Sequence, residues 1–355
     1  MSPDRETAAF DLEARAQSLG RRTRAWMLAA ASCLALIAGC GGKYDKPLEL
    51  GRVISLGLYS YLPAFRGFEN ATALSAAEGT LYVTFADSLA VPPSGEVRAY
   101  FSTGVPISGD LVKPFTGLTK PTAIGAGKRV IAVADSADQI TVRIYGLSGG
   151  APTLSFSDPD WSDVSALAVD DSGNIYVADA ARNFVRAYKP DGRRRFQVDL
   201  ADSGFGFGHV MRPTGLALDG DTLLISEAHA EKAQVQRIRT DVPQTGVPFS
   251  SAVPFIVSYT DEDGNEVLLI GPEGVAVGED GSVFVLDRVL GKVLRFDAEG
   301  NIVAVVNSAD SGGPPDLPDA VSLDTYDRPG SSASVYVLDP VKGVVHRWDP
   351  KNEQG

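Results

Sequence analysis

The sequence predicts an all-β fold, a six-bladed β-propeller with four antiparallel strands in each blade. Three observations lead to this prediction. Residues 165–192 read as short apolar strands separated by turns of Asp, Asn and Gly. The same pattern recurs six times along the chain. Acidic residues at the ends of the repeated second strands are spaced by 48, 44, 48, 60 and 52 residues, and a period of about fifty with four strands is typical of a propeller blade.

Each repeat contributes the same strands in the same order. First strands are expected at 71–76, 121–126, 165–170, 213–219, 272–278 and 319–324. Second strands are expected at 81–87, 130–135, 174–179, 222–227, 282–287 and 334–339. Third strands, each with an arginine, are expected at 96–101, 141–146, 184–189, 235–240, 292–297 and 344–349. A meander of this kind cannot bury both of its faces alone, so the repeats must pack on one another.

The ring should close with a strand from the N-terminal side. The sixth repeat ends soon after Trp348 and lacks a fourth strand of its own. Residues 52–58, RVISLGL, have strand composition and precede the first repeat. We expect this segment to pair with the third strand of the sixth blade, because closure removes the exposed sheet edges that a linear stack would leave.

Residues 1–39 are expected to be a lipoprotein signal peptide, residues 40–50 a lipidated cysteine and its tether, and residues 51–355 the propeller. Arg21, Arg22 and Arg24 precede an apolar run of fourteen residues, 25–38. As a helix this run would be about 21 Å long, which is too short to span a bilayer but fits a secretory signal. An ordinary signal peptide with an incidental Cys40 is the alternative.

The segment LIAGC, 36–40, resembles the lipobox of bacterial lipoproteins. The resemblance implies acylation of Cys40, cleavage before it, and a lipid anchor in the bacterial cell envelope. Gly41 follows the cysteine in place of the aspartate that retains such proteins at the inner membrane, so the resemblance favours the outer membrane. Contact with the membrane is expected through the lipid alone.

Composition limits the class of partner. The mature chain would keep 27 of 32 Lys and Arg and 41 of 45 Asp and Glu, a net charge of 27 − 41 = −14. Because this charge repels phosphate, no nucleic-acid partner is expected. Without Cys33, which lies in the signal, and with Cys40 acylated, no disulfide can form. Stability must therefore come from packing of the blades.

The repeat resembles the NHL repeat of six-bladed propellers. In the best copy, residues 164–170, Gly173, Asn174, Tyr176, Val177, Asp179, Asn183 and Val185 fall on family positions. The resemblance covers about residues 51–350. It implies the architecture and leaves the activity open, because such propellers serve as binding modules and as enzymes.

Acidic residues close all six second strands: Asp87, Asp135, Asp179, Glu227, Asp287 and Asp339. A carboxylate repeated in every blade is interpreted as structural, accepting backbone N–H bonds from the loop that follows the strand. The chain is more distantly similar to propellers of the SMP-30 and gluconolactonase type, which bind a divalent ion in the channel. That similarity makes Glu69, Thr214 and Glu273 candidate ligands for calcium or another divalent cation. A metal-dependent lactonase or esterase with a degenerate site is the alternative function.

The favoured function is a non-catalytic binding or scaffolding module for a protein or glycan partner, with no cofactor. No nucleophile or catalytic motif stands out in the sequence. Loops before the first strands and after the second strands should share one end of the ring. The side chains expected to form a binding face there are Lys120, Trp161, Asn183, His209, Arg212, His229 and Arg288.

Overall fold

The computed structural model describes residues 58–87, 89–90, 93–107, 109–200, 209–241, 253–327 and 332–351, apart from the side chains of residues 196–199. Cys40 and residues 52–57 lie outside this range. The described chain is all-β, and its one helical element is a single 3-10 turn, η1 (Ala309–Ser311). No helix among these residues has the length and apolar character needed to cross a bilayer.

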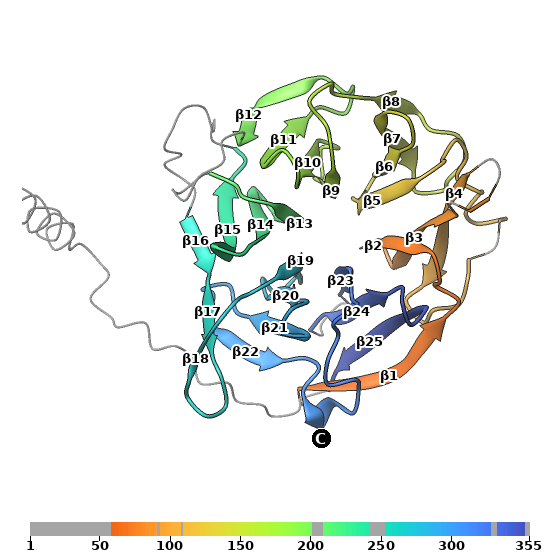
Figure 1. Cartoon of the computed structure of the whole chain (residues 1–355). Helices are drawn as coiled ribbons and strands as arrows, with labels where there is room; N and C mark the ends of the chain where they lie inside the picture. The colour runs from red at the N-terminus through yellow and green to blue at the C-terminus, as the bar shows by residue number, and fades with distance from the viewer. Residues whose placement is uncertain are drawn as a thin grey trace, which may run out of the picture. The chain divides into compact units, whose positions relative to one another are not determined.

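Six antiparallel sheets are arranged around a central axis as the blades of a propeller (Figure 1). Blade 1 holds β2 (Ala71–Ala77), β3 (Thr80–Asp87) and β4 (Ser94–Phe101). Blade 2 holds β5 (Pro121–Ala126), β6 (Val130–Ser136), β7 (Ile140–Gly146) and β8 (Leu154–Phe156). Blade 3 holds β9 (Val164–Val169), β10 (Ile175–Asp179), β11 (Phe184–Tyr188) and β12 (Arg194–Leu200).

The remaining blades continue the circuit. Blade 4 holds β13 (Pro213–Asp219), β14 (Thr222–His229), β15 (Lys232–Arg239) and β16 (Val253–Ile256), followed by a hairpin of β17 (Ser258–Thr260) and β18 (Glu266–Leu268). Blade 5 holds β19 (Pro272–Val277), β20 (Val283–Asp287), β21 (Lys292–Phe296) and β22 (Ile302–Val305). Blade 6 holds β23 (Ser322–Tyr326), β24 (Ser334–Asp339) and β25 (Val344–Pro350). The predicted six-bladed propeller is therefore confirmed.

The ring is closed by β1 (Tyr59–Arg66), which pairs antiparallel with β25 as the fourth strand of blade 6. Tyr59 lies opposite Pro350, and Phe65 lies opposite Val345. Closure by an N-terminal strand is thus confirmed. The strand was expected at 52–58, of which the structure describes only Leu58; the carbonyl of Leu58 accepts the N–H of Lys351 at 2.7 Å, and the described strand runs on to Arg66. The aromatic residues Tyr59 and Tyr61 can pack against the blade, with the Tyr61 ring centroid 5.2 Å from that of Trp348.

Blade 1 departs from the four-stranded pattern. Its outer position is taken by a single bridge between Tyr100 and Pro106 instead of a strand. Backbone bonds from Phe101 to Val105 and from Ile107 to Ala99 keep that segment against β4. The blade therefore has an outer edge of minimal length, which limits pairing with other chains.

Apolar side chains fill each interface between neighbouring blades. Six clusters of buried residues occur in the described chain, and each draws its members from two adjacent blades. The cluster between blades 5 and 6, for example, contains Phe284 and Trp348, both with 0% exposure. Because no blade has a core of its own, the fold depends on the closed ring.

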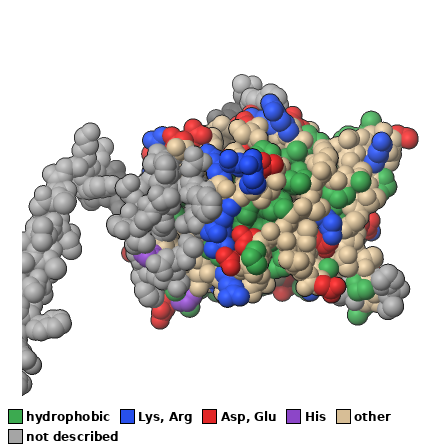
Figure 2. Space-filling view, turned by 90° about the horizontal axis from the view of Figure 1, so that it is seen from above, with side chains coloured by type: hydrophobic (Ala, Val, Ile, Leu, Met, Phe, Trp, Pro, Cys, Tyr) green, Lys and Arg blue, Asp and Glu red, His purple; other side chains and the backbone are tan. Residues whose placement is uncertain are grey.

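Side chains on the outer side of the ring show no single dominant type. Figure 2 views the propeller edge-on and shows acidic, basic and hydrophobic side chains intermixed over the visible surface. We call the end formed by loops before the first strands and after the second strands the clasp face, and the opposite end the hairpin face.

Candidate binding face

On the clasp face, a buried carboxylate at the end of a second strand accepts hydrogen bonds from a neighbouring loop. We call this arrangement a clasp. Asp179 has 0% exposure, and its carboxylate accepts the backbone N–H groups of Ser162 at 2.6 Å, Asp163 at 3.0 Å and Arg182 at 2.8 Å. The N–H of Ala180 returns a bond of 3.0 Å to the Asp163 carbonyl. One carboxylate thus fixes both the loop before the first strand and the loop after the second.

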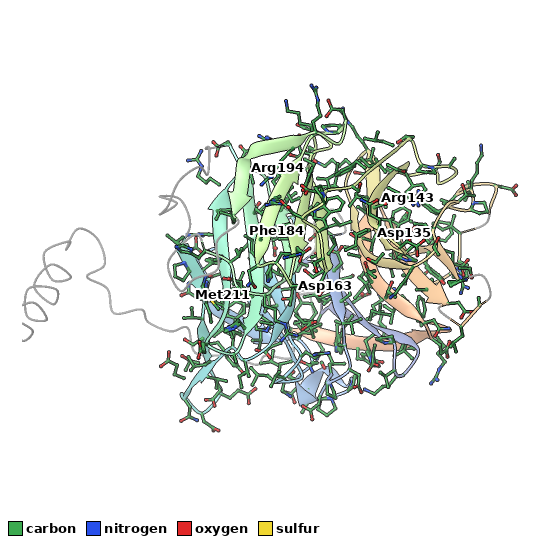
Figure 3. The ribbon with its side chains drawn as sticks, turned by 45° about the horizontal axis from the view of Figure 1, so that its top comes forward. Asp135, Arg143, Asp163, Phe184, Arg194 and Met211 are labelled. Atoms are coloured by element: carbon green, nitrogen blue, oxygen red, sulfur yellow. The ribbon has the colours of Figure 1, made fainter. Side chains whose placement is uncertain are left out.

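Three other blades repeat this clasp. The carboxylates of Asp135, Glu227 and Asp287 accept the N–H groups of Lys120, Met211 and Gly271, while the carbonyls of Lys120, Arg212 and Gly271 accept those of Ser136, Ala228 and Arg288. Asp135 also lies 3.2 Å from Nε of Arg143, beside it in Figure 3. The structural role predicted for the carboxylates is confirmed, and the predicted N–H bonds from the following loop form at Asp87, Asp179, Asp287 and Asp339. In the described chain Asp135 and Glu227 instead accept backbone N–H groups of the preceding loop, which the strand pattern did not predict.

Blade 4 uses the longer side chain of Glu227 in its clasp. Burial raises the pKa of Glu227, although the Lys232 ammonium at 3.3 Å and the amides of Gln234 and Gln236 favour the charged form. The amides donate at 2.6 and 2.9 Å. The Glu227 carboxylate is therefore already bonded to its neighbours and is poorly placed to act as a catalytic acid or base.

The clasps place three charged side chains on a rigid rim. Lys120, Asp163 and Arg212 each come directly before a first strand, in blades 2, 3 and 4, and all three are exposed. Their backbones are fixed by the bonds described above. Within the part of the chain that the structure describes, none of the three side chains forms an ion pair. This half of the clasp face therefore offers fixed and uncommitted charges to a ligand.

A groove of about 550 Å³ runs between blades 2 and 3 on this face. Lys120 and Asp163 line it together with Asp138, Gln139 and Trp161. The Trp161 side chain is 8% exposed, because its ring packs against Phe156 and Tyr188 with centroids 5.6 and 5.5 Å away. The indole thus supports the groove and presents little of its own surface, and the polar side chains supply most of the available contacts.

The other predicted residues of the face have mainly structural contacts. Asn183, with a φ of 55°, accepts the backbone N–H of Arg212 at 2.8 Å and so ties blade 3 to blade 4. The carbonyl of His209 accepts a bond of 2.6 Å from Lys232 Nζ. Nδ1 of His229 accepts the N–H of Glu231 at 3.3 Å. A ligand-binding role for these three residues stays a prediction.

Two of the three candidate metal ligands, Thr214 and Glu273, line the central cavity, and Glu69 does not. Thr214 Oγ1 donates to the carbonyl of Pro272 at 2.6 Å, and Oε2 of Glu273 lies 3.9 Å from Nε of Arg288. Glu69, in blade 1, is exposed. Its Oε1 would lie 2.6 Å from a Cβ added to Gly343. Among the described residues, no group of three or more His, Cys, Asp or Glu side chains could hold a metal ion.

Hydroxyl groups at the start of the first strands join neighbouring blades along the channel. Thr72 donates to the Pro121 carbonyl at 2.9 Å, and Ser165 donates to that of Pro213 at 2.7 Å, as Thr214 does in blade 4. These strands enclose a central cavity of about 260 Å³. The hydroxyl groups of these three residues are therefore already paired, and Glu273 and Asp324 are carboxylates that also line the cavity.

One carboxylate, Asp324, breaks the repeat inside the channel. Its Oδ2 accepts bonds from Ser75 Oγ at 3.0 Å and from the Ala76 N–H at 2.8 Å, across the seam between blades 6 and 1. Burial raises the pKa of Asp324 to about 6. Sequence reasoning missed this residue and also Asp163 and Gln139. Of these three, only Asp163 could have been found from the sequence, because it precedes a first strand as Lys120 and Arg212 do.

The fold and this face define a six-bladed β-propeller with a polar groove at one end of its channel. No protein-family model matches the chain, and no curated protein matches it. Membership of the NHL or SMP-30 families therefore stays a prediction.

The fold has parallels among solved structures. A structural genomics protein of unknown function from Bacteroides thetaiotaomicron VPI-5482 is similar at a TM-score of 0.55 and 17% identity, over 83% of this chain and 74% of that one. A chain of a nidogen/laminin complex is 18% identical over 67% of this chain and 80% of its own, with a TM-score of 0.44. At these identities the likeness concerns the fold alone.

Proposed function

We propose that this protein is a lipid-anchored, non-catalytic binding module that takes a protein or glycan partner on the clasp face. The observation that carries the proposal is the groove between blades 2 and 3, flanked by Lys120 and Asp163 on clasped backbones. Convergent polar groups on a rigid scaffold are typical of binding sites, because little conformational entropy is lost when a ligand binds.

The residues around the groove favour binding over catalysis. The strand-end acids Asp135 and Asp179 are engaged by backbone N–H groups, and Tyr188 donates to Asp158 at 2.7 Å. The charges that remain available, those of Lys120, Asp163 and Arg212, differ in sign. Such a mixed set is suited to a polar partner surface or a sugar, for which charge and hydrogen bonding determine specificity.

Photo-crosslinking tests this assignment. Benzoylphenylalanine is placed at Ser162 in the groove or at the equally exposed Ser172 on the hairpin face, in cells producing the full chain. We expect an adduct at 162 that is absent at 172. Periodate staining and mass spectrometry then distinguish a glycan from a protein.

A charge-reversal pair provides the control for the same experiment. K120E reverses a rim charge of the groove, while R129E reverses the charge of an exposed arginine on the hairpin face. Adduct formation at 162 should fall at least about tenfold in K120E and stay unchanged in R129E, as expected for loss of a charge-assisted contact of about 1.4 kcal/mol. Equal labelling at 162 and 172 would contradict the proposal.

The anchor is part of the proposal and rests on the lipobox-like segment that ends at Cys40. Mass spectrometry of the N-terminal peptide should find acyl chains on Cys40. The variant C40A should move from the detergent phase to the aqueous phase of Triton X-114. An unmodified Cys40 would remove the anchor from the proposal without affecting the groove.

A further inference from the structure

Long apolar side chains protrude from equivalent loops of three neighbouring blades. Leu89, Val289 and Val341 each stand two residues after an acidic strand end, in blades 1, 5 and 6. They are 90%, 63% and 74% exposed. The equivalent positions of blades 2 and 3 are both alanine, Ala137 and Ala181. Large apolar tips are therefore confined to one half of the clasp face.

A fourth side chain extends this surface. Ile270 is 49% exposed, and its backbone N–H donates to Asp287 at 2.7 Å, which places it beside the loop that carries Val289. We call Leu89, Ile270, Val289 and Val341 the apolar sector. Single exposed aliphatic residues are common, but four on one sector of one end of a protein indicate a surface that meets an apolar phase.

The opposite end of the ring is acidic. A cavity of about 830 Å³ at the hairpin face is lined by Glu78, Asp171, Asp219, Asp221, Glu279 and Asp327. Lys128 also lines it, and its ammonium is 2.6 Å from Asp171. Anionic headgroups would repel this end. Of the two ends, the clasp face is therefore the better suited to contact with an anionic bilayer.

The tether leads into blade 6, the central blade of the three, and enters it at the hairpin-face end, because Tyr59 lies opposite Pro350 whereas Arg66 lies opposite Val344 beside Asp339. The proposed lipid sits on Cys40, and β1 begins at Tyr59 in blade 6, between blades 5 and 1. Eighteen residues from 41 to 58 can span up to about 60 Å. The strand β1 runs from one end of the ring to the other, and its eight residues cover about 26 Å. The tether is therefore long enough to let either end of the ring reach the membrane.

We propose that the apolar sector rests on the lipid bilayer that carries the anchor, with its aliphatic tips in the headgroup–acyl boundary. This orientation rests on the proposed lipid anchor and adds a second membrane contact to it, which increases the persistence of anchoring. Blades 2 to 4, with Lys120 and the groove, are then lifted from the bilayer. The membrane thus orients the groove toward the aqueous side.

Tryptophan quenching by brominated phosphatidylcholine tests the orientation. The background is low, because Trp161 and Trp348 are 8% and 0% exposed. V341W places an indole in the apolar sector, and S172W places one on the hairpin face. With lipidated protein in vesicles holding one quarter phosphatidylglycerol, we expect at least about threefold stronger quenching for V341W than for S172W.

Two further variants in the V341W background serve as controls. L89S/V289S should lose most of the quenching. V105S, at an exposed valine in the bridged segment after β4, should keep it.

The outcomes separate the two proposals. If Cys40 is found unmodified, the anchor fails, and the orientation is then tested by coupling a maleimide lipid to Cys40, the one cysteine of the mature chain. Equal quenching of V341W and S172W overturns the orientation even when the anchor is present. Shielding of V341W from aqueous acrylamide without any quenching by brominated lipid would assign the sector to a protein partner and would also overturn it.

Discussion

Tyr61 Oη lies 2.9 Å from Nδ1 of His346, and this hydrogen bond joins positions 285 residues apart. Tyr61 belongs to the closing strand β1 and His346 to β25, so the contact lies on the seam of the ring. Their rings, with that of Trp348, form a small aromatic group with centroid distances of 5.2 to 5.9 Å. The seam is therefore fastened by side chains as well as by the strand ladder.

Truncation of an aromatic residue at this seam should weaken the whole ring. Tyr59 is 1% exposed and packs edge-on against Phe284 of blade 5 at 6.4 Å. Tyr59→Ala should lower the free energy of unfolding by about 3–5 kcal/mol, because it leaves a cavity between blades. Urea denaturation gives this value, and Pro63→Ala at an exposed position of the same strand is the control. A loss below 1 kcal/mol for Tyr59→Ala would indicate that β1 is dispensable.

Removal of a buried clasp acid should cost more than removal of an exposed one. Asp179→Ala leaves three backbone N–H groups without their acceptor and should destabilise the protein by about 2–4 kcal/mol. Asp87 is exposed and, among the described residues, accepts only the N–H groups of Leu89 and Ala90, so Asp87→Ala should cost below about 1 kcal/mol. Equal losses in thermal or urea unfolding would show that the clasp does not contribute to stability.

Protonation of Asp324 should stabilise the folded ring. Its folded pKa of about 6 lies above the ordinary value of 3.8 because of burial, so the native state binds the proton more tightly than the unfolded state. This contribution is full below about pH 4 and is lost as pH rises through 6, a change of about 3 kcal/mol. The stability of wild type minus that of Asp324→Asn should therefore fall between pH 4 and 7 in urea titrations. A pH-independent difference would refute the assignment.

His346 should act with the opposite sign in the same pH range. Burial lowers its pKa from 6.5 to about 4, with Lys342 acting in the same direction and Asp339 opposing it. The native state therefore favours the neutral ring, and stability present above pH 6.5 is lost as pH falls toward 4, by about 3 kcal/mol. His346→Gln should flatten this dependence. NMR titration of the imidazole checks the pKa directly, and a midpoint near 6.5 would contradict the prediction.

A methyl group at Gly125 should force blades 2 and 3 apart. An added Cβ would lie 2.6 Å from the backbone oxygen of Leu167 in the neighbouring first strand. Gly125→Ala should cost about 1–3 kcal/mol because the strand must move to relieve the overlap. Gly109→Ala is the matched control, since nothing lies within 4 Å of its added Cβ. Unfolding curves that coincide for the two variants would show that the channel wall can adjust freely.

Most strand positions could be predicted because the local pattern is strong. The second strand of blade 3 was expected at 174–179 and is found at Ile175–Asp179. The closing strand was expected at 52–58, and its described part is Tyr59–Arg66, which pairs with β25 almost three hundred residues along the chain. Trp161 was expected on an open face, but Phe156 and Tyr188 bury it from blades 2 and 3. The residue pattern gave no indication of that contact.

The sequence alone determined the repeat, the number of blades and the positions of the acidic strand ends, because alternating apolar residues and turn residues act within a few positions of one another. Tertiary structure alone decided the register of the closing strand, which loops each carboxylate ties together, and on which blades of the clasp face the exposed aliphatic side chains lie. These features arise from contacts between distant residues, such as Tyr61 with His346, whose energies depend on three-dimensional proximity and leave no local periodic signal.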